Sequence, residues 1–170
     1  LTGTTITPYR ILGADPGRHL GLPSPTTTLV IDLGTGLVLS TPDDQPRTFR
    51  VAVGGMHLQP VTVHHDGDQV GVYLSLSPGA VRALFGVRPA DLCARNLDLG
   101  ELAPALARRL YDELGAVAPD RRGDECARMI GEALGAAGTP PADPDAQRAW
   151  QLLAEHRGQV TVSRLVELSG

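Results

Sequence analysis

The stretch 70–86, VGVYLSLSPGAVRALFG, contains the point at which the chain changes from one kind of secondary structure to another. Up to Leu76, apolar residues alternate with Gly, Tyr and Ser, which is the pattern of a strand with one buried face. Ser77-Pro78 then predicts a helix start, because Ser is a preferred N-cap and Pro fits the first helical position. Apolar residues continue at helical spacing as far as Gly86, which suits a helix C-terminus. The stretch therefore divides the chain into a strand-rich part and a helical part.

Period-two alternation recurs in three runs upstream, TLVIDL at 28–33, FRVAV at 49–53 and VTVHH at 61–65. Such alternation over several short runs is typical of antiparallel strands that bury one face. Asp66-Gly67 follows the last of these runs and predicts a tight hairpin, because Asp-Gly suits central turn positions that need positive φ. Short strands at this spacing predict a small antiparallel β-barrel or sandwich.

Helical spacing dominates after residue 86. Asp98 and Glu101 form a pair like a capping box, and the apolar residues that follow predict one helix up to Leu114, then helices at about 122–135 and from Asp143-Pro144 to Gly158. The Gly- and Pro-rich stretch 135–144 predicts a linker. We therefore expect an α+β chain with a β-rich domain and its C-terminal helices over 1–134, a linker over 135–144 and a further helical segment over 145–170.

The composition favours a folded chain that does not hold DNA by itself. The 170 residues include 15 basic residues, all of them Arg, against 19 acidic ones, for a formal net charge of −4. A free-standing DNA-binding domain usually has a basic footprint, and pairs such as Arg108-Arg109 are isolated. No run approaches the roughly 18 apolar residues that span a bilayer, and Cys93 and Cys126 fit no metal or disulfide pattern. We therefore expect a cytoplasmic protein with free thiols and no membrane contact.

The last residues, GQVTVSRLVELSG at 158–170, resemble the first helix of the DNA-binding domain of AraC-type transcription regulators. Val162, Leu165 and Val166 match the core positions of that helix, and Gly170 matches its turn glycine. The residues just before, WQLL at 150–153, resemble the lead-in helix of the same domain.

The N-terminal blocks PGRHLGLPS (16–24), VGGMH (53–57) and LSPGA (76–80) resemble the sensor region of a group of such regulators from high-GC bacteria. The resemblance implies a cupin-like sensor that binds an unknown small-molecule effector and forms a homodimer. It also implies that the helix-turn-helix domain is cut after its first helix, so that the intact protein binds DNA through a C-terminal domain missing from this chain. We expect this fragment alone not to bind DNA.

The interior of the barrel is the expected effector pocket, because ligand pockets are mostly apolar with a few convergent polar groups. The polar residues best placed within the strand blocks are His19, Arg50, His57 and Tyr73. For Arg50 and Tyr73 the sequence also allows side chains that face solvent or a covering helix. The block around His19 could equally be structural, with its Pro and Gly residues shaping a loop that closes the barrel.

A leucine stripe, defined by Leu99, Leu102, Leu106 and Leu110, has two interpretations. It predicts either a helix packed on the sheet or, as the resemblance implies, a dimerisation surface, since two-fold symmetric regulators bind paired half-sites.

We find no catalytic set and expect neither an enzyme nor a metal or cofactor. His64 and His65 are adjacent, so on a strand they point to opposite faces and no histidine spacing demands a metal. Gly54-Gly55 predicts a turn, because no strand, glycine loop and helix follow in the order of a phosphate site. The competing hypothesis is a cupin-like metal-dependent enzyme that uses His57, and a third is a dimerisation module with a filled barrel.

Overall fold

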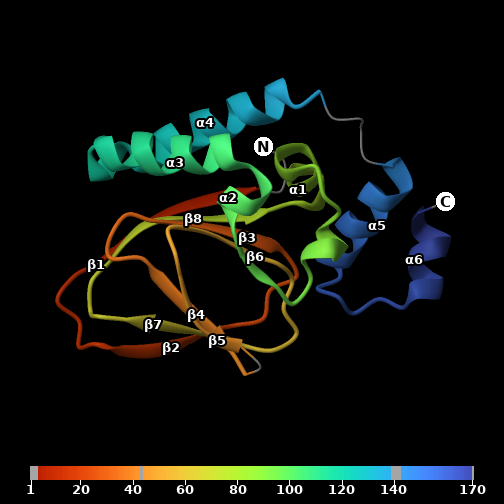
Figure 1. Cartoon of the computed structure of the whole chain (residues 1–170). Coiled ribbons are helices and arrows are strands. Elements are labelled where there is room, and N and C mark those ends of the chain that lie inside the picture. Colours follow the sequence, from red (N-terminus) through yellow and green to blue (C-terminus); the bar gives the residue numbers. More distant parts are fainter. Residues whose placement is uncertain (1–3, 43, 139–142, 170) are drawn as a thin grey trace. The chain divides into compact units, whose positions relative to one another are not determined.

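The computed structural model describes residues 4–42, 44–138 and 143–169, and the chain divides into two compact units, Leu1–Gly138 and Thr139–Gly170 (Figure 1). Each unit is described by itself. Of the predicted linker 135–144, residues 139–142 lie outside the described residues, and its first two residues belong to the last helix of the first unit.

The strands of the first unit form two antiparallel sheets. The five-stranded sheet has the order β1 (Thr5–Ile11), β8 (Gln69–Leu76), β3 (Thr27–Asp32), β6 (Val51–Gly54) and β9 (Asn96–Asp98). The four-stranded sheet has the order β2 (Gly17–Gly21), β7 (Val61–His65), β4 (Leu37–Thr41) and β5 (Asp44–Phe49). The predicted α+β class is confirmed, and the described strands form two sheets rather than one closed barrel.

The described part of this unit has four α-helices: α1 (Pro78–Phe85), which precedes β9, and α2 (Leu99–Leu102), α3 (Pro104–Ala116) and α4 (Arg122–Ala136), which follow it. Short 3-10 helices, η1 (Pro89–Leu92) and η2 (Pro119–Arg121), lie between them. Helices α3 and α4 lie across the five-stranded sheet, on the side away from the four-stranded sheet (Figure 1).

The main core lies between the five-stranded sheet and these helices. Alternate residues of β3, β6 and β8 point to the helices, and their partners come from α1 to α4; all are buried: Leu29, Ile31, Val51, Val53, Val72, Leu74, Val81, Leu99, Leu110, Leu114, Met129 and Ile130. A smaller core of Leu37, Leu39, Phe49 and Ala52 lies on the other face of the five-stranded sheet. The five-stranded sheet is therefore covered on both faces.

The start and end of α1 confirm the sequence prediction. The Ser77 hydroxyl oxygen accepts a hydrogen bond from the backbone N–H of Ala80 at 3.3 Å. Gly86 has φ 69°, and its N–H donates to the carbonyl of Arg82. The capping box of Asp98 with Glu101 is also present.

The prediction of a single helix from this capping box to Leu114 is wrong. Helix α2 ends at Leu102, and α3 begins at Pro104, whose ring nitrogen has no hydrogen to donate to a preceding turn. Ala103 between them has an extended φ of −143°.

The hairpin predicted at Asp66-Gly67 is wrong as well. Strands β7 and β8 belong to different sheets, so the three residues between them carry the chain from one sheet to the other. The Asp66 carboxylate accepts a hydrogen bond from the N–H of Asp68 at 3.2 Å, and the carbonyl of Gly67 accepts one from Ala14 at 3.2 Å. Gly67 supplies the positive φ, 108°.

Two more strand predictions need correction. The run 49–53 is two strands, because Phe49 ends β5 and Val51 begins β6 in the other sheet, with the bend at Arg50. Within the block 16–24, one interpretation of which was a closing loop, residues 17–21 form strand β2, which pairs with β7.

The second unit contains α5 (Pro144–Glu155) and α6 (Val162–Ser169). The Asp143 carboxylate caps α5 by accepting a hydrogen bond from the N–H of Asp145 at 2.9 Å. The prediction that this helix runs to Gly158 is wrong, since Arg157 and Gly158 have φ values of 51° and 74° and turn the chain. Gly170 lies outside the described residues.

Candidate ligand site between the two sheets

A cavity of about 400 Å³ lies between the two sheets. Most of its lining is apolar, and the polar side chains reach it from strands β1, β2, β3, β8 and β9 and from the segments next to β3 and β6. The lining residues include Tyr9, His19, Ser24, Thr28, Val30, Leu37, Leu39, Ala52, Gly54, His57, Val61, Val63, Gln69, Tyr73 and Asn96. Ile11 and Leu22 also line it and are 48% and 80% exposed, so the cavity opens to solvent on their side.

The position of Tyr9 depends on a glycine in the neighbouring strand. Tyr9 on β1 pairs with Gly71 on β8, and Gly71 pairs in turn with Asp32 on β3. A Cβ atom on Gly71 would overlap the carbonyl oxygen of Ile31 and lie 2.6 Å from the Tyr9 hydroxyl. The missing side chain therefore gives the Tyr9 ring space to lie over β8 and brings its hydroxyl into the interior.

The position of His57 depends on Gly54 and Gly55. A Cβ on Gly54 would lie 2.7 Å from the hydroxyl of Thr28, and one on Gly55 would overlap the backbone of Leu92. The predicted turn at these two glycines is therefore wrong for Gly54, which is part of β6. Their role is close packing, which lets the chain after β6 pass η1 and place His57 at the cavity.

Two polar atoms of the lining residues are buried without a hydrogen-bond partner: the hydroxyl of Tyr9 and Nε2 of His57. The hydroxyl of Thr28, in contrast, donates to the carbonyl of Gly54 at 3.4 Å. Burial raises the pKa of Tyr9 above its ordinary range, and the negative charge of Asp32 raises it further. The cavity thus offers a protonated phenol and an imidazole nitrogen to whatever occupies it.

Three of the four predicted effector residues, His19, His57 and Tyr73, line the cavity. Arg50 does not: it is exposed, and its guanidinium lies over the ring of Tyr111 on α3, 5.1 Å from the centroid. Arg50 comes directly after β5, where the chain crosses from one sheet to the other. The prediction that it lines the pocket is therefore wrong. The alternative prediction, that its side chain faces a covering helix, agrees with its contact with Tyr111.

Sequence reasoning missed Tyr9. Tyr9 and Ile11 alternate on β1 and both line the cavity, but Pro8 lies within the run and weakens its strand pattern. Proline is tolerated on an edge strand, and β1 is the edge strand of its sheet. The period-two spacing was therefore the signal that could have found it.

The leucine stripe lies largely in the core. Leu99 and Leu110 are 0% exposed within this single chain, and Leu102 and Leu106 are partly buried against the same cluster. The side chains of Leu99 and Leu110 are therefore not available to a second copy in this fold, which corrects their assignment to a dimer surface. The interpretation of a helix packed on the sheet accounts for them. Homodimerisation by another surface stays a prediction.

The histidines of β7 point to opposite faces, as predicted. Nε2 of His64 is 2.8 Å from the hydroxyl of Ser40, whereas the ring of His65 lies 5.6 Å from that of His19. Over residues 4–42, 44–138 and 143–169, no group of three His, Cys, Asp or Glu side chains is placed to hold a metal ion.

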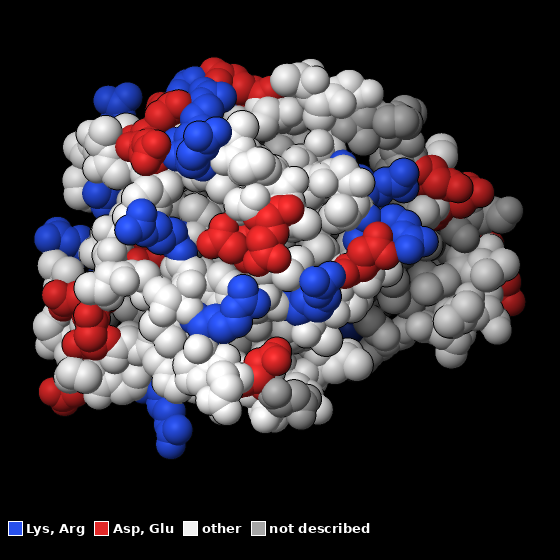
Figure 2. Space-filling view, viewed as in Figure 1, with Lys and Arg blue, Asp and Glu red and all other residues white. Residues whose placement is uncertain are grey.

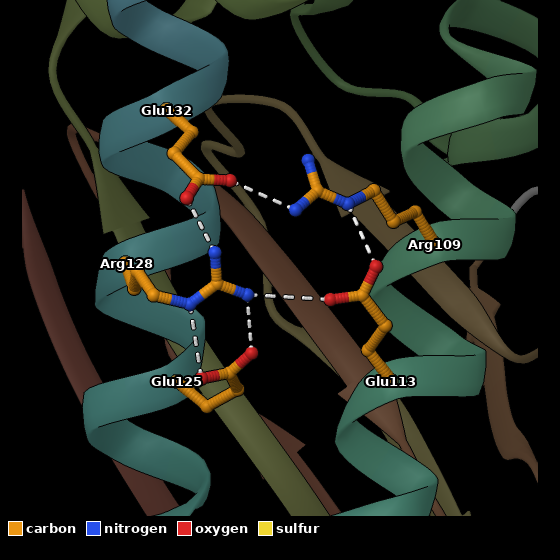
Figure 3. A network of polar contacts seen from close by, with 5 residues as sticks. All are labelled: Arg109, Glu113, Glu125, Arg128 and Glu132. Atoms are coloured by element: carbon orange, nitrogen blue, oxygen red, sulfur yellow. Dashed lines mark hydrogen bonds and ion pairs between the residues drawn. The ribbon is translucent and has the colours of Figure 1, made fainter.

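The outer surface of α3 and α4 carries an ion-pair network (Figure 3). Arg109 bonds Glu113 at 2.7 Å on its own helix and Glu132 of α4 at 2.8 Å. Arg128 pairs with Glu125 and Glu132 and reaches Glu113 at 3.3 Å. The hydrogen bond to Glu132 raises the pKa of Arg109, to which Glu113 adds. These arginines hold the two covering helices together and are paired with carboxylates rather than free for phosphate.

The face seen in Figure 2 shows basic and acidic side chains interspersed, with no large region of one sign. In the described part of the chain, no helix combines the length and the apolar character that crossing a membrane requires. Comparisons with protein-family models, with curated proteins and with solved structures gave no match.

Proposed function

We propose that this chain is the effector-sensing and dimerisation part of an AraC-type transcription regulator, with a small molecule bound between the two sheets. The observation that carries the proposal is the cavity of about 400 Å³. Its size falls in the range of small-molecule sites, and such sites combine a mostly apolar lining with a few placed polar groups.

The position of the cavity suits a sensor. Tyr73 lines it, while its neighbours Val72 and Leu74 are 0% exposed in the core under the helices. On β3, Val30 lines the cavity, whereas its neighbour Ile31 is buried in the core under the helices. A ligand that touches one face of these strands therefore acts on the elements that support α3 and α4. The ligand changes the arrangement of the helices only if it binds more tightly to one of two arrangements of the sheet.

The remaining parts of the proposal follow from the resemblance. The second unit, with α5 and α6, is the start of the helix-turn-helix domain, and DNA is bound by a C-terminal domain outside this chain. The formal net charge of −4 supports the expectation that these residues alone do not bind DNA. The regulator acts in the cytoplasm as a homodimer.

The test fills the cavity. Ala52 is 1% exposed and lines it, so Ala52→Phe places a ring in the space that the ligand needs. Ala105→Phe, on the exposed surface of α3, adds the same ring outside it and is the matched control. Both are compared with the wild type by native mass spectrometry, as purified and after incubation with a library of small organic molecules.

We expect small-molecule adducts on the wild type and on Ala105→Phe, and none on Ala52→Phe. Adducts that survive in a folded Ala52→Phe variant would place the ligand elsewhere and contradict the proposal. A stoichiometric mass of zinc or iron, lost on His57→Ala, would favour the cupin-like enzyme instead.

A further inference from the structure

The Tyr9 hydroxyl and Nε2 of His57 are buried without a hydrogen-bond partner within the chain. Buried polar atoms in folded proteins are nearly always satisfied, because leaving one unpaired is costly. Both residues line the same cavity. The simplest way to satisfy both atoms is a bound molecule with polar groups of its own.

The surroundings of Tyr9 define what it can bind. The Asp32 carboxylate lies near enough for its charge to act on Tyr9. Its Oδ1 already accepts hydrogen bonds from the N–H groups of Gly34 and Gly36, both at 2.9 Å. The Tyr9 hydroxyl has no hydrogen-bond partner in the chain and can donate to a ligand oxygen, and the negative charge of Asp32 disfavours an anion at that place.

The charges of the residues that line the cavity also disfavour an ionic ligand. The described residues that line the cavity include no Arg, Asp or Glu. The guanidinium of Arg47 lies over the ring of Phe49, and that of Arg50 lies over the ring of Tyr111. Neither arginine is among the lining residues. An ionic ligand would thus lose its hydration without direct contact with an oppositely charged carboxylate or guanidinium in the described lining.

The two residues with unpartnered atoms reach the cavity from positions that lie far apart along β3. Tyr9 on β1 pairs with Gly71 on β8, and Gly71 pairs with Asp32 on β3. His57 comes three residues after Gly54, which pairs with Thr28 on β3. Asp32 and Thr28 are four residues apart on β3, which corresponds to about 13 Å along the strand. A ligand that meets both atoms therefore needs two polar groups at separate positions.

We infer that the cavity selects an uncharged, largely apolar molecule that offers a hydrogen-bond acceptor to Tyr9 and, at a separate position, a second polar group to His57. This inference rests on the proposed function only in taking the cavity as the ligand site.

The test uses small probes of matched shape: acetophenone, which has a carbonyl acceptor, ethylbenzene, which has none, benzoate, which is an anion, and benzylamine, which is a cation. A fifth probe, para-diacetylbenzene, carries a carbonyl at each end. Each is titrated into the isotope-labelled chain, and the dissociation constant is read from the NMR shifts of cavity residues. The variants are Tyr9→Phe and His57→Phe, with Tyr111→Phe and His156→Phe, both outside the cavity, as matched controls.

We expect acetophenone to bind more tightly than ethylbenzene, and benzoate and benzylamine to bind more weakly than either. Tyr9→Phe should weaken acetophenone by about fivefold, the effect of one hydrogen bond, and leave ethylbenzene unchanged or tighter. Para-diacetylbenzene should gain over acetophenone, and His57→Phe should remove that gain. The two control variants should match the wild type.

The failures are distinguishable. Benzoate or benzylamine binding best in the cavity, or a Tyr9→Phe variant that binds acetophenone as the wild type does, would overturn the ligand class and leave the cavity as a ligand site. If no probe shifts the cavity residues, both this inference and the proposed function fail.

Discussion

Shortening Leu110 to Ala tests whether the leucine stripe is part of the core of one chain or of a contact between chains. Leu110 is 0% exposed on α3, and Leu114, Met129 and Ile130 belong to the same buried cluster. The change removes three buried carbons, which at about 0.8 kcal/mol each gives about 2.4 kcal/mol of lost transfer free energy. The cavity left behind adds to this, so we expect a loss of about 3–4 kcal/mol, within the range measured for buried leucines.

The assay is urea unfolding followed by far-UV circular dichroism, at a low and a high protein concentration. Leu58→Ala is the control because Leu58 is 97% exposed, and a surface change of this kind alters stability by at most about 0.5 kcal/mol. A core residue gives a loss that is the same at both concentrations, whereas a subunit contact gives one that depends on concentration. A small loss for Leu110→Ala, or one that varies with concentration, would refute the packing described here.

Two further predictions concern buried titratable groups. Burial raises the pKa of Asp32 above 3.8, so the folded chain holds this proton more tightly than the unfolded chain, and the contribution of Asp32 to stability is lost as pH rises from 3.8 through the raised pKa. Asp32→Asn cannot ionise, and its unfolding free energy should therefore improve relative to the wild type between acidic and neutral pH in urea titrations. Asp112→Asn, the same change at an exposed residue, is the matched control, and a constant difference for Asp32→Asn would contradict the reasoning. Cys93 is exposed, whereas burial raises the pKa of the Cys126 thiol to about 12. A disulfide reagent should thus label only Cys93 until denaturant is added, and labelling of Cys126 in the folded chain would show that its site is open.

The parts of the fold that the sequence predicted well depend on local signals. The N-cap at Ser77 and the αL residue at Gly86 act within one helical turn. The helix predicted at about 122–135 is α4, which repeats its apolar residues within the same segment. These signals need no knowledge of the rest of the chain.

The strand pairing was not predictable from the same signals. Alternation determines which residues share a face of a strand, but it does not determine the neighbouring strand. Asp66-Gly67 is a good hairpin sequence, yet the partners of β7 are β2 and β4, and those of β8 are β1 and β3. Pairing over such distances depends on the whole sandwich, so the turn residues alone were misleading.

The candidate site was only partly predictable, because alternation identifies the residues on one face only within a strand. Tyr73 could be placed because it alternates with the buried residues of β8. His57 lies three residues after the end of β6 and outside a strand, so alternation did not place it. Arg50 could not be placed either, because it lies where the chain bends between two strands and the alternation stops. The alternation of Tyr9 with Ile11 could have marked the face on which Tyr9 lies, but only the register shows that its partner on β8 is Gly71, which leaves room for the ring.

The two faces of the five-stranded sheet differ in a way that a simple scaffold does not require. On the helix side, β6 presents Val51 and Val53, which are 3% and 0% exposed in the main core. On the cavity side, the same strand presents Ala52 and Gly54. Protein interiors are normally packed to crystal density, and a larger residue at Ala52 would fill the space. The unfilled volume lowers stability, and an occupant that contacts the small residues and satisfies the Tyr9 hydroxyl would restore it. The small residues that β6 presents on this face therefore favour a sandwich that holds a ligand over one that only supports the helices.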